Sequence, residues 1–331
     1  MRAYLVRVSF MRFRVCSLRV VLSAAILSAG PVAAVGATNW PMAGGGPEGR
    51  LASTSFPGPK LKVSWSSATE FVADQFQCVA VSNGRVFAIG KTASSLPSQR
   101  LFAFEADTGT LLWQSGDIAP IPGGVAVDGG RMCPAVLGDR VFAGGKGVVQ
   151  AFDVSTGTLL WNQTSFPTPF LGIGATTPSF DVMRPLIARD GKVYAASQYY
   201  TVALRASDGA VVWGEDDRAW MAPRASSTQI MQLWGGGGVV ARDNGTGTVG
   251  WQLTVPHSNN YWYSNVALHG GTAYVLKASN AAPPATVVQA INPDGTVAWS
   301  ANQTGYRQPR GLAVADDRVY VAYICMDTYC S

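Results

Sequence analysis

The sequence predicts an all-β fold, a single β-propeller of four-stranded blades. Two observations support this prediction: a glycine followed four residues later by a tryptophan recurs along the chain, and the step between tryptophans stays near 48 residues. The pairs are Gly109/Trp113, Gly157/Trp161, Gly209/Trp213, Gly247/Trp251 and Gly295/Trp299, with Trp65 ahead of them and steps of 48, 48, 52, 38 and 48 residues. Recurrence at this length is typical of one supersecondary unit copied around a repeat architecture.

The second repeat shows the elements of the unit most clearly. Residues 139–143 and 148–152 are short runs of β-branched and aromatic residues, which favour strands, and residues 153–157 are turn formers. Residues 158–161 form a further strand that ends at the tryptophan, and the apolar residues 133–136 supply one before the first. Four short strands in about 48 residues are typical of a propeller blade.

The glycine of each pair is expected to take a positive φ in the hairpin turn. A fixed turn sets the strand register, so the tryptophan always faces the same way and fills the space between stacked sheets. In four repeats an alanine lies six residues before the glycine (Ala103, Ala151, Ala203, Ala241), where it would leave room for a neighbouring blade's indole; the fifth has Gln289 there.

The blade number follows from counting repeats. The sixth repeat begins at residues 317–321 and lacks its outer strands, whereas residues 61–65 form an unpaired outer strand that ends at Trp65. We expect this N-terminal strand to complete the last blade of a six-bladed ring, because closure hides two sheet edges. If the chain is truncated, seven or eight blades are the alternative.

The repeat resembles a known family. Gly-Arg-Val-Phe at residues 84–87, with Gly-Asp-Arg-Val-Phe at 138–142 and Gly-Lys-Val-Tyr at 191–194 in the next repeats, is the first part of a motif that continues as Asp-x-x-Thr-Gly-x-Leu-Leu-Trp at 153–161. This motif is similar to the pyrroloquinoline-quinone-like (quinoprotein-type) propeller repeat. The opening segment, with Asn39-Trp40-Pro41-Met42, also resembles that family, and the likeness covers about residues 39–325. It implies either a calcium- and quinone-dependent alcohol or sugar dehydrogenase, or a non-catalytic scaffold like the lipoprotein of the outer-membrane barrel assembly machinery.

The first 37 residues are typical of a secretory signal peptide. They carry five arginines and no acid, followed by an apolar run at 20–29 and small residues up to Ala37. We therefore expect a signal peptide at 1–37, a propeller domain at 38–331, and an extracellular or periplasmic product. The apolar run is too short to span a bilayer.

Charge argues against nucleic acid as a partner. The chain has 25 basic and 20 acidic residues, and five of the basic ones lie in the leader, which leaves 20 of each sign. A domain without net charge offers no basic face for nucleic acid. We expect a monomer without a membrane span.

Four cysteines follow the leader, and an even number in an exported protein predicts disulfides. Cys325 and Cys330 are close enough in sequence to join. Cys78 and Cys133 each lie seven residues before the arginine of the second strand, so they occupy equivalent positions in adjacent blades. The alternative for this second pair is two buried thiols.

No catalytic residue is predicted. The vicinal cysteines that the family's quinone enzymes commonly carry are absent, no His-rich or Cys-x-x-Cys metal motif occurs, and the acids stand in no motif. Three long aromatic inter-blade loops, 166–170, 218–224 and 256–263, are the candidates for binding. Their candidate residues are Phe170, Trp220, Arg224, His257, Tyr261, Trp262 and Tyr263. The alternative is that these aromatics pack the core.

The sequence therefore favours a secreted, non-catalytic scaffold that binds a protein or carbohydrate partner at its loop face, without cofactor or metal. The alternative is a dehydrogenase that uses pyrroloquinoline quinone and calcium. A hydrolase or lyase with loop acids in the axial channel ranks third.

Overall fold

The protein is all-β throughout the part of the chain that the structure describes. The computed structural model describes residues 41–42, 45–48, 63–66, 79–91, 99–118, 133–145, 147–166, 184–197, 200–216, 221–234, 237–254, 261–279, 285–304, 307–315 and 318–325. Every regular element in these ranges is a β-strand, and within them no helix is long and apolar enough to cross a membrane.

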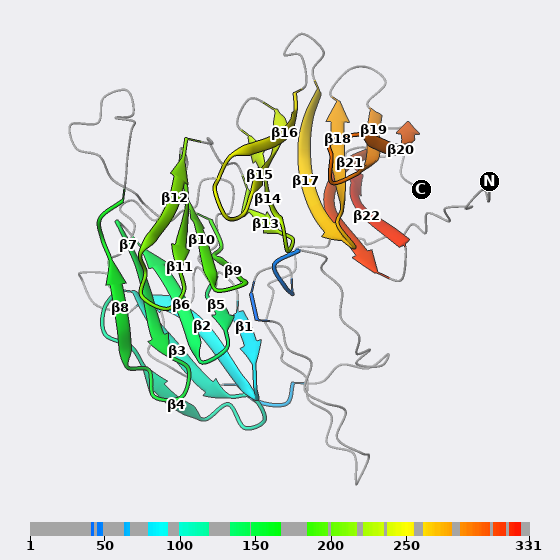
Figure 1. Ribbon diagram of the computed structural model, residues 1–331. Coiled ribbons are helices and arrows are strands. Elements are labelled where there is room, and N and C mark those ends of the chain that lie inside the picture. Colours follow the sequence, from blue (N-terminus) through cyan, green and yellow to red (C-terminus); the bar gives the residue numbers. More distant parts are fainter. Residues whose placement is uncertain are drawn as a thin grey trace, which may run out of the picture. The chain divides into compact units, whose positions relative to one another are not determined.

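The chain divides into two compact units, and one consists of Leu18–Gly46 with Ser53–Arg218. It contains three antiparallel sheets, each with its four strands in sequence order (Figure 1). The strands of the first are β1 (Val79–Ser82), β2 (Arg85–Lys91), β3 (Gln99–Glu105) and β4 (Leu111–Gln114). Those of the second are β5 (Ala135–Leu137), β6 (Arg140–Gly145), β7 (Val148–Asp153) and β8 (Leu159–Gln163). Those of the third are β9 (Ile187–Arg189), β10 (Lys192–Ala196), β11 (Thr201–Arg205) and β12 (Val211–Glu215).

The other unit consists of Ala219–Ser331 with Pro47–Ala52 and the chain's first residues. It contains two sheets of the same four-stranded topology and one pair of strands. The first sheet has β13 (Arg224–Ala225), β14 (Gln229–Trp234), β15 (Gly238–Asp243) and β16 (Val249–Leu253). The second has β17 (Tyr261–His269), β18 (Thr272–Ser279), β19 (Ala285–Ile291) and β20 (Val297–Thr304). The pair is β21 (Arg307–Ala315) with β22 (Arg318–Cys325).

The turn before each fourth strand has the predicted backbone. Its glycine takes a positive φ in all five four-stranded sheets: 72° at Gly109, 71° at Gly157, 76° at Gly209, 77° at Gly247 and 87° at Gly295. A β-bulge follows in each sheet, one step from the tryptophan's pairing position. Turn and bulge together set the direction of the indole.

Each four-stranded sheet carries a cross-strand row, which we define as four register partners, one from each strand. In the first sheet this row is Ala80, Phe87, Ala103 and Trp113. The alanine therefore makes room for the indole of its own sheet, and not for a neighbour's as expected. The ring of the second strand packs on that indole, with 5.9 Å between the centroids of Phe87 and Trp113.

The fifth repeat, which has Gln289 where the others have alanine, is not an exception once the strands are aligned by their pairing. Its turn is one residue shorter, so Ala290, and not Gln289, pairs with Trp299. A fixed offset in sequence misplaced the alanine because it assumed turns of equal length.

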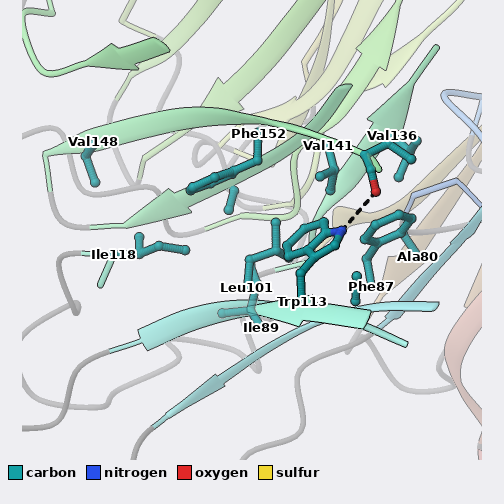
Figure 2. Close-up of a cluster of buried hydrophobic side chains, with 13 residues drawn as sticks. Ala80, Phe87, Ile89, Leu101, Trp113, Ile118, Val136, Val141, Val148 and Phe152 are labelled. Atoms are coloured by element: carbon teal, nitrogen blue, oxygen red, sulfur yellow. Dashed lines mark hydrogen bonds between the residues drawn. The ribbon is translucent and has the colours of Figure 1, made fainter. Parts of the chain in front are cut away.

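Within each unit, the indole also packs on the turn glycine of the following repeat. A Cβ on Gly157 would lie 2.6 Å from the ring of Trp113. Trp113 Nε1 donates to the carbonyl of Val154 at 3.0 Å, a bond drawn in Figure 2. Glycine is therefore required at this position for two reasons: the backbone has a positive φ, and the indole ring lies where a Cβ would be. The same close approach recurs in the pairs Trp65/Gly109, Trp161/Gly209 and Trp251/Gly295.

Trp213 bears out only part of what the repeat predicts. It ends the row of the third sheet as a register partner of Ala203, it is buried, and its ring centroid lies 6.0 Å from that of Tyr194. The glycine of the following repeat, Gly247, belongs to the other compact unit. Trp213 is therefore confirmed as a core residue of its own sheet, whereas its predicted role as a wedge against the next sheet stays a prediction.

The docked indoles join neighbouring sheets through continuous apolar layers. Figure 2 shows Trp113 between side chains of its own sheet, such as Phe87 and Leu101, and those of the next, such as Val136 and Val141. Within the other unit a corresponding cluster joins the sheet β13–β16 to the sheet β17–β20. These indoles thus act as wedges between sheets.

The predicted ring closure stays a prediction. Trp65 docks as Trp113 does, since its Nε1 donates to the carbonyl of Ala106 at 2.7 Å and its ring lies against Gly109. However, residues 63–66 are not in a strand, and residues 61–62 lie outside the described ranges. The number of blades is likewise untested.

Candidate functional site

Of the seven candidate binding residues, Arg224, Tyr261, Trp262 and Tyr263 lie in the described ranges. Phe170, Trp220 and His257 lie outside them. The four described residues are in strands and not in loops as predicted: Arg224 begins β13, and the other three begin β17. Aromatic residues favour the pleated surface, so the long run of aromatics near residue 261 extends the strand.

Tyr263 is a core residue. It is buried within the cluster that joins the sheet β13–β16 to the sheet β17–β20. Its hydroxyl donates to Oε1 of Gln289 at 3.3 Å, and burial raises the pKa of the phenol. Gln289 Nε2 in turn donates to the hydroxyl of Ser300 at 3.2 Å. For Tyr263, the geometry matches the alternative that the aromatics pack the core.

Arg224 has the unusual environment. It is only 8% exposed, and its hydrogen bonds to described residues both come from Nη1, to the carbonyls of Ala222 at 3.4 Å and Pro223 at 3.2 Å. Its Nε is buried without a hydrogen-bond acceptor in the described part of the chain. Desolvation by burial lowers the pKa of the guanidinium to about 10, so the group is still charged at neutral pH. A buried cation without a carboxylate partner is costly and rare.

The cross-strand rows show that Arg224 departs from the repeat. The first position of the row is a fully buried Ala80, Ala135, Ile187 or Ala267 in the other four-stranded sheets, and Arg224 occupies it in the sheet β13–β16. The second position is aromatic in those sheets and is Met231 here. The flexible side chain of Met231 thus accommodates the large side chain of Arg224 beside it.

The backbone of the opening segment lies along inner strands. Within one unit, the carbonyls of Pro47 and Glu48 accept from Ala225 N at 2.7 Å and Leu268 N at 2.9 Å. Within the other, the carbonyl of Pro41 accepts from Val136 N at 2.8 Å. Each of these three amides belongs to the residue directly after the first position of its row. The carbonyls of the opening segment therefore accept hydrogen bonds from equivalent backbone amides on the first strands of three sheets. Arg224 therefore has the segment 47–48 beside its strand.

The described residues contain no group of three or more His, Cys, Asp or Glu side chains that could hold a metal. Calcium takes six to eight oxygen ligands, several of them carboxylates. These residues therefore supply no calcium donor set, and we derive no quinone chemistry from them.

Sequence reasoning selected Arg224 for the wrong reason, as a loop cation among aromatics. The signal that distinguishes it is its register against four repeats. In all five sheets the first position of the row lies seven residues before the second, so comparing the repeats at this offset would have shown Arg224 as the exception.

Five sheets of identical topology, each with a tryptophan at the end of its cross-strand row, define a β-propeller repeat protein. The profile of the family described as "Outer membrane protein assembly factor BamB" matches residues 97–280, more than half of the chain. The protein therefore belongs to this family of PQQ-like repeat proteins, as its repeat predicted.

Two solved structures share the fold. BamB from Moraxella catarrhalis is 22% identical, with a TM-score of 0.54 over 73% of this chain and 68% of that one. The quinohemoprotein alcohol dehydrogenase from Comamonas testosteroni is 14% identical, with a TM-score of 0.51 over 87% of this chain. The match spans about half of that enzyme, 52% of its length. No curated protein matches the sequence.

Proposed function

We propose that the protein is an exported, non-catalytic scaffold that binds a protein partner near the inner strands of the sheet β13–β16. The observation that carries the proposal is the row that begins at Arg224. In a repeat protein, positions that serve the scaffold recur from sheet to sheet, whereas a position that serves a partner has no reason to recur. Arg224 and Met231 break a row whose alanine and tryptophan are kept.

The family supports this choice of function. Its description names an assembly factor of outer membrane proteins, and the match covers the sheet β13–β16. The leader at 1–37 supports export. Cys133 is buried and Cys78 lies outside the described residues, so the bridge between them stays a prediction, one that fits an oxidising compartment.

Site-specific photo-crosslinking tests the proposal. A photoreactive residue replaces Trp262, at the start of β17, and in a matched control it replaces Leu160, which is 43% exposed on β8. We expect a distinct adduct at 262 in the native host and none at 160, with mass spectrometry to name the partner. Equal adducts at both positions, or none at either, would contradict the proposal.

The dehydrogenase alternative has its own test. The purified protein is titrated with pyrroloquinoline quinone and calcium, and dye-linked oxidation of alcohols and sugars is followed. We expect no turnover. Tight quinone binding with turnover would replace the scaffold by the enzyme.

A further inference from the structure

We propose that Arg224 is the binding site for a carboxylate group, supplied either by a free organic acid or by an acidic side chain of a partner. The inference rests on the proposed binding function and names the chemistry of its contact. It starts from the position of the guanidinium, which is buried in a place that four other sheets fill with alanine or isoleucine.

Among the described residues, this cation has no counter-charge. Its two hydrogen bonds there are long, end on neutral carbonyls and use Nη1 alone. Desolvation accounts for its lowered pKa, and no carboxylate of the described ranges offsets it. Removing a charge from water without pairing it is unfavourable, so a scaffold that needed only packing would keep the alanine or isoleucine of the other rows.

The free donor geometry matches a carboxylate. Nε has no acceptor within the described ranges, and the Nε edge of a guanidinium can donate two parallel hydrogen bonds to the two oxygens of a carboxylate. One cation balances one carboxylate, whereas a phosphate dianion would require a second cation beside Arg224.

The rows of the other sheets suggest the variant that distinguishes a binding arginine from a structural one. Arg224→Ala with Met231→Phe restores Ala–Phe–Ala–Trp, the row of the sheets β1–β4 and β5–β8. If Arg224 is kept for binding, this double variant loses the ligand and keeps or gains thermal stability, because binding sites are commonly maintained at the expense of stability. A structural arginine would instead lower the melting temperature when removed.

The experiment measures melting temperature against sodium acetate, with acetamide as the neutral isostere and ionic strength held constant. A second arm uses the capped peptide Ac-Gly-Glu-Gly-NH2 against Ac-Gly-Gln-Gly-NH2. In parallel, the ¹H–¹⁵N resonance of Arg224 Nε reports contact directly. Arg205→Ala, which removes an exposed arginine paired with Asp208, is the charge-matched control.

We expect a saturable rise in melting temperature and a saturable shift of the Nε resonance with acetate, with the Glu peptide, or with both. The arm that responds more strongly identifies the source. Both effects should persist in Arg205→Ala and vanish in the double variant. If the double variant does not fold, Arg224→Gln, which is neutral and nearly as long, takes its place.

Three results would overturn the inference: no response to either carboxylate, a response that the double variant retains, or a double variant that folds but melts well below the wild type. If one of these results is obtained while photo-crosslinks at residue 262 are still observed, only the carboxylate site is rejected. The proposed scaffold function is then retained.

Discussion

The sheets β5–β8 and β13–β16 share topology, turn and bulge, and differ at one end. Both end their row in alanine and tryptophan, Ala151–Trp161 and Ala241–Trp251. They begin it differently, with the apolar Ala135 in one and the buried cation Arg224 in the other. The outer end is constrained because its indole must fit the turn of the next repeat. At the inner end, the position that four sheets fill with a buried alanine or isoleucine holds a cation in the sheet β13–β16.

The largest effect should come from the end that the two sheets share. Trp161→Ala and Trp251→Ala each remove a docked indole and its hydrogen bond, to the carbonyl of Ala206 or Pro293. We expect each to lose about 3–5 kcal/mol of unfolding free energy, as large-to-small core substitutions do. Urea denaturation measures both. A clearly smaller loss at Trp251 would show that the sheet β13–β16 departs from the repeat at its outer end too.

Two glycines of the sheet β5–β8 separate the roles of φ and of packing. Gly138 and Gly157 have similar positive φ values, 62° and 71°, but a Cβ at Gly138 meets nothing within 4 Å, whereas one at Gly157 meets Trp113. We expect Gly138→Ala to lose about 1 kcal/mol through strain alone.

Gly157→Ala should lose about 3 kcal/mol, because overpacking of the indole adds to that strain. Thermal or urea melts of both variants give the difference. Equal losses would mean that the ring moves aside at no cost, and the wedge interpretation of the tryptophans would fail.

The smallest effect concerns the turn aspartates, which the two sheets share. Asp153 Oδ1 accepts from Ser155 N, Thr156 N and the Thr156 hydroxyl at 2.8, 2.8 and 3.0 Å, and Asp243 does the same in its own turn. The hydrogen bonds from Thr156 hold the pKa of Asp153 below its usual value.

A lowered folded pKa stabilises the fold above the unfolded value of about 3.9, and this contribution disappears as pH falls through the lower folded pKa. Asp153→Ala should therefore lose about 0.5–1 kcal/mol at pH 7, a small value because the turn is exposed. The loss should shrink in acid. Urea midpoints at pH 7 and pH 2.5 test this, and a loss that is the same at both pH values would exclude the ionised carboxylate as its cause.

By itself, the sequence determined the repeat, the all-β class, the strand boundaries to within a few residues and the positive φ of Gly109 and its equivalents. These are local properties, because turn chemistry and the alternation of apolar residues act over a few residues. The family followed from the same repeat.

Only the tertiary structure decided what each residue faces. It placed the indole of Trp113 on Gly157, it assigned Ala290 in place of Gln289, and it moved Tyr263 from a binding loop into the core. It also revealed Arg224 as a buried cation with no carboxylate partner in the described ranges. Burial and pairing depend on strands that are distant in sequence, and a single-residue difference in turn length shifts every register partner beyond it.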